Sequence, residues 1–209
     1  MRRLPIFLAV DVSESMVGEN HRQMEAGIEV IVKTLRTDPY ALETAFLSII
    51  AFAGKVKIVS PLVEISSFVP PRLPIGGGTS LGLALGTLMD EIDNKVSTSN
   101  HERKGDWKPI VFLFTDGKPT DETSSSIKRW NDSYRTKANL VALSIGTDAD
   151  MEVLKSLTDD VLVLSDTSSE GFARFINWVS RSIQNQSRSV STGKDARISL
   201  DKTEKDLIV

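Results

Sequence analysis

Residues 6–16 read IFLAVDVSESM, an apolar segment followed by alternating polar residues. Ile6 to Val10 form a continuous apolar run that stops at an acid, Asp11. An apolar run without polar alternation predicts a strand buried on both faces, which is typical of parallel sheets covered by helices on both sides. Apolar residues at helical spacing follow over 21–35, so the chain begins with a strand and then a helix.

The rest of the chain repeats this alternation of apolar strands and amphipathic helices. Further strands are expected over residues 44–52, 56–65, 110–114, 140–145 and 161–164, and further helices over 79–96, 125–138, 151–157 and 170–183. The 56–65 strand follows a tight turn and contains Pro61, so we expect it to run antiparallel at the sheet edge. The pattern predicts an α/β fold: a doubly wound, mostly parallel sheet with one antiparallel edge strand and helices on both faces.

The composition is that of one soluble globular domain. Hydrophobic residues make up 40% of the 209 residues and charged residues 25%, and the net charge is −3, so no basic footprint indicates nucleic acid or an anionic membrane as partner. From about Ser187 the sequence becomes rich in Ser, Lys, Asp and Thr. We therefore expect a domain over residues 1–186 and a flexible C-terminal tail over residues 187–209.

The location is expected to be cytoplasmic. The chain has no cysteine, which excludes disulfides, thiolate metal sites and cysteine nucleophiles and suits a reducing compartment. The apolar run that ends at Asp11 is too short for an export signal. No segment approaches the roughly 20 apolar residues of a membrane-spanning helix.

Oxygen-bearing side chains follow three of the expected structural units. They are Asp11, Ser13 and Ser15 after the first strand, Thr79 after the Gly76–Gly78 loop, and Asp116 after the 110–114 strand. In open α/β sheets, ligands gather where strands end. In an extended segment, residues two apart point to the same side, so the first three can face one point. Hard oxygen donors favour Mg²⁺, with Mn²⁺ or Ca²⁺ as alternatives.

Each of these motifs also has an ordinary structural explanation. Ser13 or Ser15 could cap the first helix, and the Gly-Gly-Gly-Thr and Thr-Asp-Gly sequences are common in loops and turns. Their joint occurrence at adjacent sheet-end loops favours a shared metal site. Asp121 could add charge near that metal, although a solvated loop acid is its more ordinary role.

The spacing Asp-x-Ser-x-Ser with a distant Thr and Asp resembles the metal-ion-dependent adhesion site (MIDAS) of von Willebrand factor A (VWA) domains, which have a Rossmann-like fold. All five positions are present in the family's order, and Glu14 stands where the family often has glycine. The resemblance implies that Ser13, Ser15 and Thr79 are direct ligands. It also implies that Asp11 and Asp116 act mostly through water, which leaves the metal electrophilic toward a carboxylate of a partner protein.

Over roughly residues 1–187 the sequence is most similar to bacterial tellurium-resistance-associated VWA proteins of TerY type. The stretches that carry this likeness are RRLP at 2–5, DPYALET at 38–44 and TDGKPTD at 115–121. The likeness implies a non-enzymatic scaffold or sensor in a tellurite or stress-response phosphorylation system. Its implied partners are a protein kinase and a PP2C-type phosphatase.

The alternative is a metal-dependent phosphohydrolase or phosphotransfer enzyme on the same type of sheet. The haloacid-dehalogenase pattern needs a second aspartate at position 13, where Ser13 stands, and the Gly-Lys-Ser/Thr of a P-loop is absent. The sequence therefore favours a binding module over an enzyme.

Overall fold

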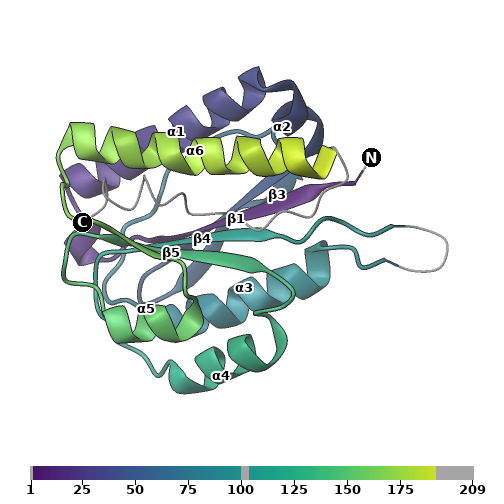
Figure 1. The fold of residues 1–209 in the computed structure, drawn as a ribbon. Helices are drawn as coiled ribbons and strands as arrows, with labels where there is room; N and C mark the ends of the chain where they lie inside the picture. Colours follow the sequence, from purple (N-terminus) through teal and green to yellow (C-terminus); the bar gives the residue numbers. More distant parts are fainter. Residues whose placement is uncertain (1, 100–103, 192–209) are drawn as a thin grey trace.

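The computed structural model describes residues 2–99 and 104–191, and these form one six-stranded sheet between two layers of helices (Figure 1). The strands are β1 (Leu4–Asp11), β2 (Ala45–Phe52), β3 (Val56–Glu64), β4 (Ile110–Thr115), β5 (Asn139–Ile145) and β6 (Val161–Leu164), and their order is β3-β2-β1-β4-β5-β6. Every neighbouring pair is parallel except β2 and β3. The predicted fold class is confirmed, including the antiparallel edge strand.

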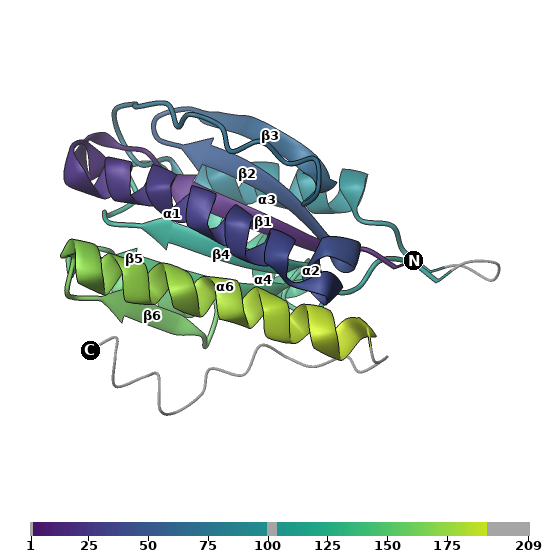
Figure 2. The same cartoon turned by 90° about the horizontal axis from the view of Figure 1, so that it is seen from above.

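Helices cover both faces of the sheet. They are α1 (Glu19–Thr37), α2 (Pro39–Thr44), α3 (Leu81–Lys95), α4 (Ser124–Ser133), α5 (Met151–Leu157) and α6 (Ser169–Ser191), with a short 3₁₀ turn, η1 (Glu14–Met16), before α1. Helices α1, α2 and α6 lie on one side and α3, α4 and α5 on the other (Figures 1 and 2). None of the described helices is long and apolar enough to cross a lipid bilayer.

Strand β1 joins the two halves of the hydrophobic core, and all eight of its residues are buried. Successive side chains of a strand point to opposite faces. Ile6, Leu8 and Val10 therefore pack in the cluster beneath α1 and α6, whereas Phe7 and Ala9 pack in the cluster above α3. Burial on both faces accounts for the unbroken apolar run in the sequence.

The strand order reverses between β1 and β4. From β1 the chain builds β2 and β3 toward one edge, and it then returns to build β4, β5 and β6 toward the other. The parallel register pairs Val10 with Phe114, so Asp11 and Thr115 end their strands at the same level. Such a reversal opens a crevice at the carboxyl edge of a sheet, where ligands of α/β proteins bind.

Helix α2 was not predicted, because an Asp-Pro pair, here Asp38-Pro39, is typical of a turn that ends a helix. Asp38 instead caps a six-residue helix: its Oδ1 accepts from the amides of Tyr40 and Ala41, each at 3.0 Å. Pro39 occupies the first helical position, where its missing N–H costs nothing. So short a helix shows too little apolar periodicity to be recognised in the sequence.

Helices α4 and α6 end several residues away from the predicted positions. Helix α4 stops at Ser133, and a turn leads from there to β5. Helix α6 continues to Ser191, and its last turns bury Ser187 and Val190. The polar composition of these turns indicated a tail, although they are helical and pack against the rest of the domain. Residues 192–209 of the expected tail and residues 100–103 of the loop before β4 lie outside the described residues.

An ion pair ties the end of α6 to the start of α2. Arg188 donates through Nη2 to Oδ2 of Asp38 at 2.7 Å, and the Asp38 side chain is only 2% exposed. Burial would raise the pKa of Asp38, but the amides of Ala41 and Tyr40 and the guanidinium of Arg188 together hold it below its ordinary value. The ionised carboxylate is thus part of the native structure.

Replacing Arg188 by glutamine should lower the free energy of unfolding by about 1–2 kcal/mol at neutral pH, because Asp38 loses its cationic partner. Because the pKa of Asp38 is lower in the folded state, its ionised carboxylate stabilises the fold at pH values above the unfolded-state pKa of about 4. This stabilisation is lost as the pH falls through the folded-state pKa. The difference between wild type and Arg188→Gln should therefore shrink in acid, as measured by urea unfolding. Arg181→Gln, an exposed position on the same helix, is the control, and an equal loss there would contradict the assignment.

Candidate metal centre

Asp11 links the loops that follow β1 and β4. Its side chain is fully buried. Oδ1 accepts from the Ser13 amide at 2.9 Å, and Oδ2 accepts from the Thr115 hydroxyl at 2.7 Å. Both carboxylate oxygens are therefore held by neutral donors, one in the loop after β1 and the other at the end of β4. Sequence reasoning missed Thr115, whose signal was a hydroxyl at the end of an otherwise apolar strand.

Ser13, Ser15 and Asp116 form a hydrogen-bonded row. The Oγ atoms of Ser13 and Ser15 lie 3.0 Å apart, and Ser15 Oγ donates to Asp116 Oδ1 at 2.7 Å. The expected extended alternation holds only to Ser13, because Ser15 lies in the η1 turn, which still brings its hydroxyl beside that of Ser13. The alternative that these serines cap the first helix is wrong. Ser13 makes no side-chain cap, and α1 begins after Gly18.

Thr79 lies near the row of Ser13, Ser15 and Asp116, on a loop that is hydrogen-bonded to neighbouring segments. The Gly76 amide donates to the carbonyl oxygen of Val12 at 3.0 Å, and the Ser80 amide donates to that of Ala53 at 2.8 Å. These bonds hold the Gly76–Gly78 loop against the end of β1 and the turn between β2 and β3. Thr79 itself is 5% exposed.

Gly117 shows how near Thr79 lies to the serine row. A Cβ placed on Gly117 would lie 3.6 Å from Thr79 Oγ1 and 3.8 Å from Ser15 Oγ. Both hydroxyls therefore border the residue that directly follows Asp116. The structure thus brings all five predicted positions to one end of the sheet, the carboxyl ends of β1 and β4.

The surroundings of Asp11 and Asp116 disfavour the ionised form of both carboxyl groups. Burial raises the pKa of Asp11 against the hydrogen bonds from Ser13 and Thr115, and burial likewise raises the pKa of Asp116, with Asp148 adding to the effect. Among the described residues, no ion pair reaches either carboxylate. A bound cation would favour the ionised form of both.

The donor set is richer in hydroxyls than in carboxylates. Within residues 2–99 and 104–191, no group of three or more acidic or histidine side chains is arranged to hold a metal. Glu14 does not join the set: its exposed side chain lies over the Gly-rich loop, with Oε1 2.8 Å from where a Cβ on Gly77 would be. Neutral and anionic oxygens of this kind suit Mg²⁺, Mn²⁺ or Ca²⁺.

An open groove leads away from the centre along the loop between β5 and α5. Its lining includes Ser15, Asp116, Lys118, Asp148 and Glu152. The centre is therefore accessible from outside the chain, although most of its side chains are buried.

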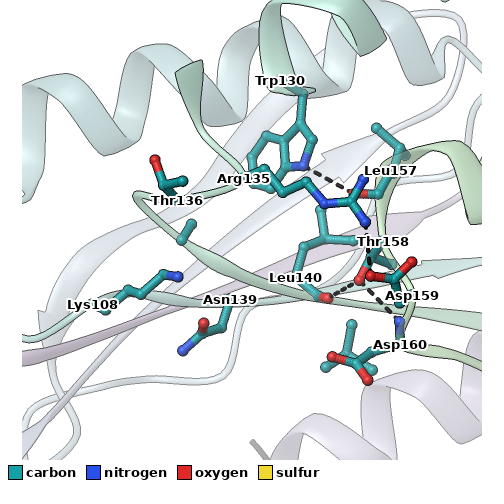
Figure 3. A pocket seen from close by; sticks show the side chains of 12 residues that line it. Lys108, Trp130, Arg135, Thr136, Asn139, Leu140, Leu157, Thr158, Asp159 and Asp160 are labelled. Atoms are coloured by element: carbon teal, nitrogen blue, oxygen red, sulfur yellow. Dashed lines mark hydrogen bonds and ion pairs between the residues drawn. The ribbon is translucent and has the colours of Figure 1, made fainter. Parts of the chain in front are cut away.

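A second hollow lies at the opposite, amino edge of the sheet (Figure 3). Its polar groups contact one another: Trp130 Nε1 donates to the Leu157 carbonyl at 3.2 Å, and Arg135 pairs with Asp159 at 2.8 Å. Thr158 donates to the Leu140 carbonyl at 2.7 Å. These bonds join α4, α5 and β5, so we assign no ligand to this hollow.

Comparisons with known proteins agree with the geometry. A family model for the von Willebrand factor type A domain matches residues 6–186. A von Willebrand factor type A structure from Catenulispora acidiphila has 20% identity and a TM-score of 0.68, with coverage of 88% of this chain and 43% of that one. Proximal thread matrix protein 1 from the mussel byssus, solved with a zinc-occupied MIDAS motif, has 18% identity, a TM-score of 0.60 and coverage of 86% and 46%.

The pilus adhesin SpaC from Lactobacillus rhamnosus GG is also similar, with 14% identity, a TM-score of 0.69 and coverage of 88% of this chain and 31% of that one. This chain spans less than half the length of these three solved proteins. None of the curated proteins matches it. Likeness at such low identity shows the shared fold, and the family model covers nearly the whole described chain. The chain therefore belongs to the von Willebrand factor type A (VWA) domain family.

Proposed function

We propose that this chain is a divalent-metal-dependent protein-binding module. Domains of its family are in general metal-dependent interaction modules. The proposed metal site consists of Asp11, Ser13, Ser15, Thr79 and Asp116, and the proposed cation is Mg²⁺, with Mn²⁺ or Ca²⁺ as alternatives. The observation that carries the proposal is the hydrogen-bonded row from Ser13 through Ser15 to Asp116, with the Thr79 hydroxyl beside it.

The hydroxyls of Ser13, Ser15 and Thr79 would be the direct protein ligands. Asp11 has both oxygens engaged by Ser13 and Thr115, which supports a role in orienting the loops and adding charge through water. A cation held mainly by neutral oxygens retains the charge to attract a carboxylate from outside the chain. We propose that a partner protein supplies this Asp or Glu along the groove beside Asp116.

The biological setting is part of the same proposal. The three stretches that resemble TerY-type proteins support a scaffold or sensor role in a tellurite or stress-response phosphorylation system. A protein kinase and a PP2C-type phosphatase are the proposed partners, and the cytoplasm is the location that suits them.

We also propose that the chain is not an enzyme. A phosphohydrolase at this site would need a general base, and His21 is the histidine that follows Ser15 most closely in the sequence. Its Nε2 lies 3.2 Å from the carbonyl oxygen of Leu73, so the ring is engaged with the backbone.

Mg²⁺ or Mn²⁺ should raise the melting temperature of the chain, because a ligand that binds only the folded state stabilises it. At 100 times the dissociation constant, the gain should be about 2.7 kcal/mol. Asp11→Ala and Thr79→Ala should each abolish the shift, as measured by differential scanning calorimetry with and without metal.

Asp159→Ala is the matched control, since it removes an exposed acid at the opposite edge of the sheet. It should keep the full metal-dependent shift. Absence of any shift in the wild type at millimolar metal would remove the basis of the proposal. Metal-dependent turnover of a phosphate ester, lost in Asp11→Ala, would favour the enzyme alternative.

Partner capture should depend on the same site. In a pull-down with the immobilised chain, proteins retained in Mg²⁺ should be released by a chelator and should not bind Asp11→Ala. Quantitative mass spectrometry of wild type and Asp11→Ala, each with Mg²⁺ and with chelator, identifies the proteins that bind in this way. Retention of the same proteins in chelator would show that binding uses another surface.

A further inference from the structure

The loop between β4 and α4, which carries Asp116, is bonded to the segment that carries Thr79. The Thr120 amide donates to the Thr79 carbonyl oxygen at 2.9 Å, and the Thr79 amide donates to Thr120 Oγ1 at 2.9 Å. One residue of the Asp116 loop thus binds the peptide groups on both sides of the Thr79 side chain. Thr120 is itself exposed, so its hydroxyl contributes this contact without being part of the core.

The next residue, Asp121, caps helix α3 from outside that helix. Its Oδ1 and Oδ2 accept from the amides of Gly82 and Leu83, at 3.1 and 2.9 Å. First-turn amides have no partner within their own helix, and Ser80, the preceding residue, makes no side-chain cap. Asp121 therefore has a specific structural role, which differs from the solvated loop acid considered from the sequence.

Glycines permit the close approach of the two segments. A Cβ on Gly82 would lie 2.2 Å from the carbonyl oxygen of Glu122, a separation that no side chain tolerates. Gly78 has a φ of +75°, and a Cβ there would lie 3.2 Å from Thr120 Oγ1. The start of α3 and the Asp116 loop consequently pack backbone against backbone.

We propose that Thr120 and Asp121, here termed the Thr120–Asp121 clamp, are positioning residues for the metal site. The clamp fixes Thr79 relative to Asp116 before any metal binds. Without the clamp, the Gly76–Gly78 loop would become ordered only when the metal binds. The entropy lost in ordering the loop would then lower the metal affinity. The inference rests on the proposed metal site, to which it adds two residues that touch no metal themselves.

Thr120→Val removes the acceptor at constant size, whereas Thr120→Ser retains the hydroxyl. In Thr120→Val, the dissociation constant for Mg²⁺ alone, measured by calorimetric titration, should rise about tenfold. Loss of other residues that orient metal ligands has an effect of this size. Thr120→Ser should stay close to the wild type. Thr87→Val is the matched control, since it removes a hydroxyl that donates to Leu83 O farther along α3.

A second pair of variants tests Asp121. Asp121→Asn replaces one accepting oxygen by a donor and should also weaken Mg²⁺ binding. Glu122→Gln alters the neighbouring acid, which accepts from Ser124 and Ser125 at the start of α4 instead, and should leave Mg²⁺ binding unchanged.

The outcomes separate this inference from the proposed function. If wild type binds Mg²⁺ and Thr120→Val and Asp121→Asn bind it equally well with only a lower melting temperature, the clamp is merely structural and the inference is wrong. If Thr120→Ser weakens binding as much as Thr120→Val, the hydroxyl is not the cause. Failure of the wild type to bind Mg²⁺ would instead overturn the metal site itself.

Discussion

The parallel pairing of β1 with β4 holds together the two halves of the sheet and the candidate metal centre at its edge. These strands are buried on both faces and meet where the strand order reverses, so their ends open the crevice of the sheet. The hydrogen bond from Thr115 to Asp11 joins the two ends. Displacement of either strand would separate the serine row from Asp116 and expose apolar surface on both sides of the sheet.

The centre combines rigid support with unbalanced charge. Its side chains come from three segments, which are joined by the hydrogen bond from Thr115 to Asp11 and by the two hydrogen bonds between Thr79 and Thr120. Its acids are buried without a basic partner among the described residues, whereas Asp38, equally buried, has Arg188. The fold thus neutralises a buried acid where it needs only stability, and at the sheet edge it leaves two acids whose charge a cation can balance.

Much of the fold could be predicted because its signals are local. The unbroken apolar run of β1 and the proline in β3 each reflect a physical restriction that acts within a few residues. Four of the five predicted site positions lie at or just after strand ends and the fifth, Thr79, follows the Gly76–Gly78 loop, so their placement at one edge of the sheet could also be predicted. Helix α2 was missed because a six-residue helix shows too little apolar periodicity, even though its cap by Asp38 is local. The end of α6 was missed because the burial of Ser187 depends on tertiary contacts. Thr115 and Thr120 were missed because their partners lie far away in sequence.

The edge strand β3 has a consequence for how copies of this domain behave together. Pro61 offers no amide to a neighbouring chain, and the register of β3 against β2 shifts twice near Ile49. An irregular edge with a proline is a poor template for continuing a sheet. The β3 edge is therefore poorly suited to backbone pairing between two copies of the domain.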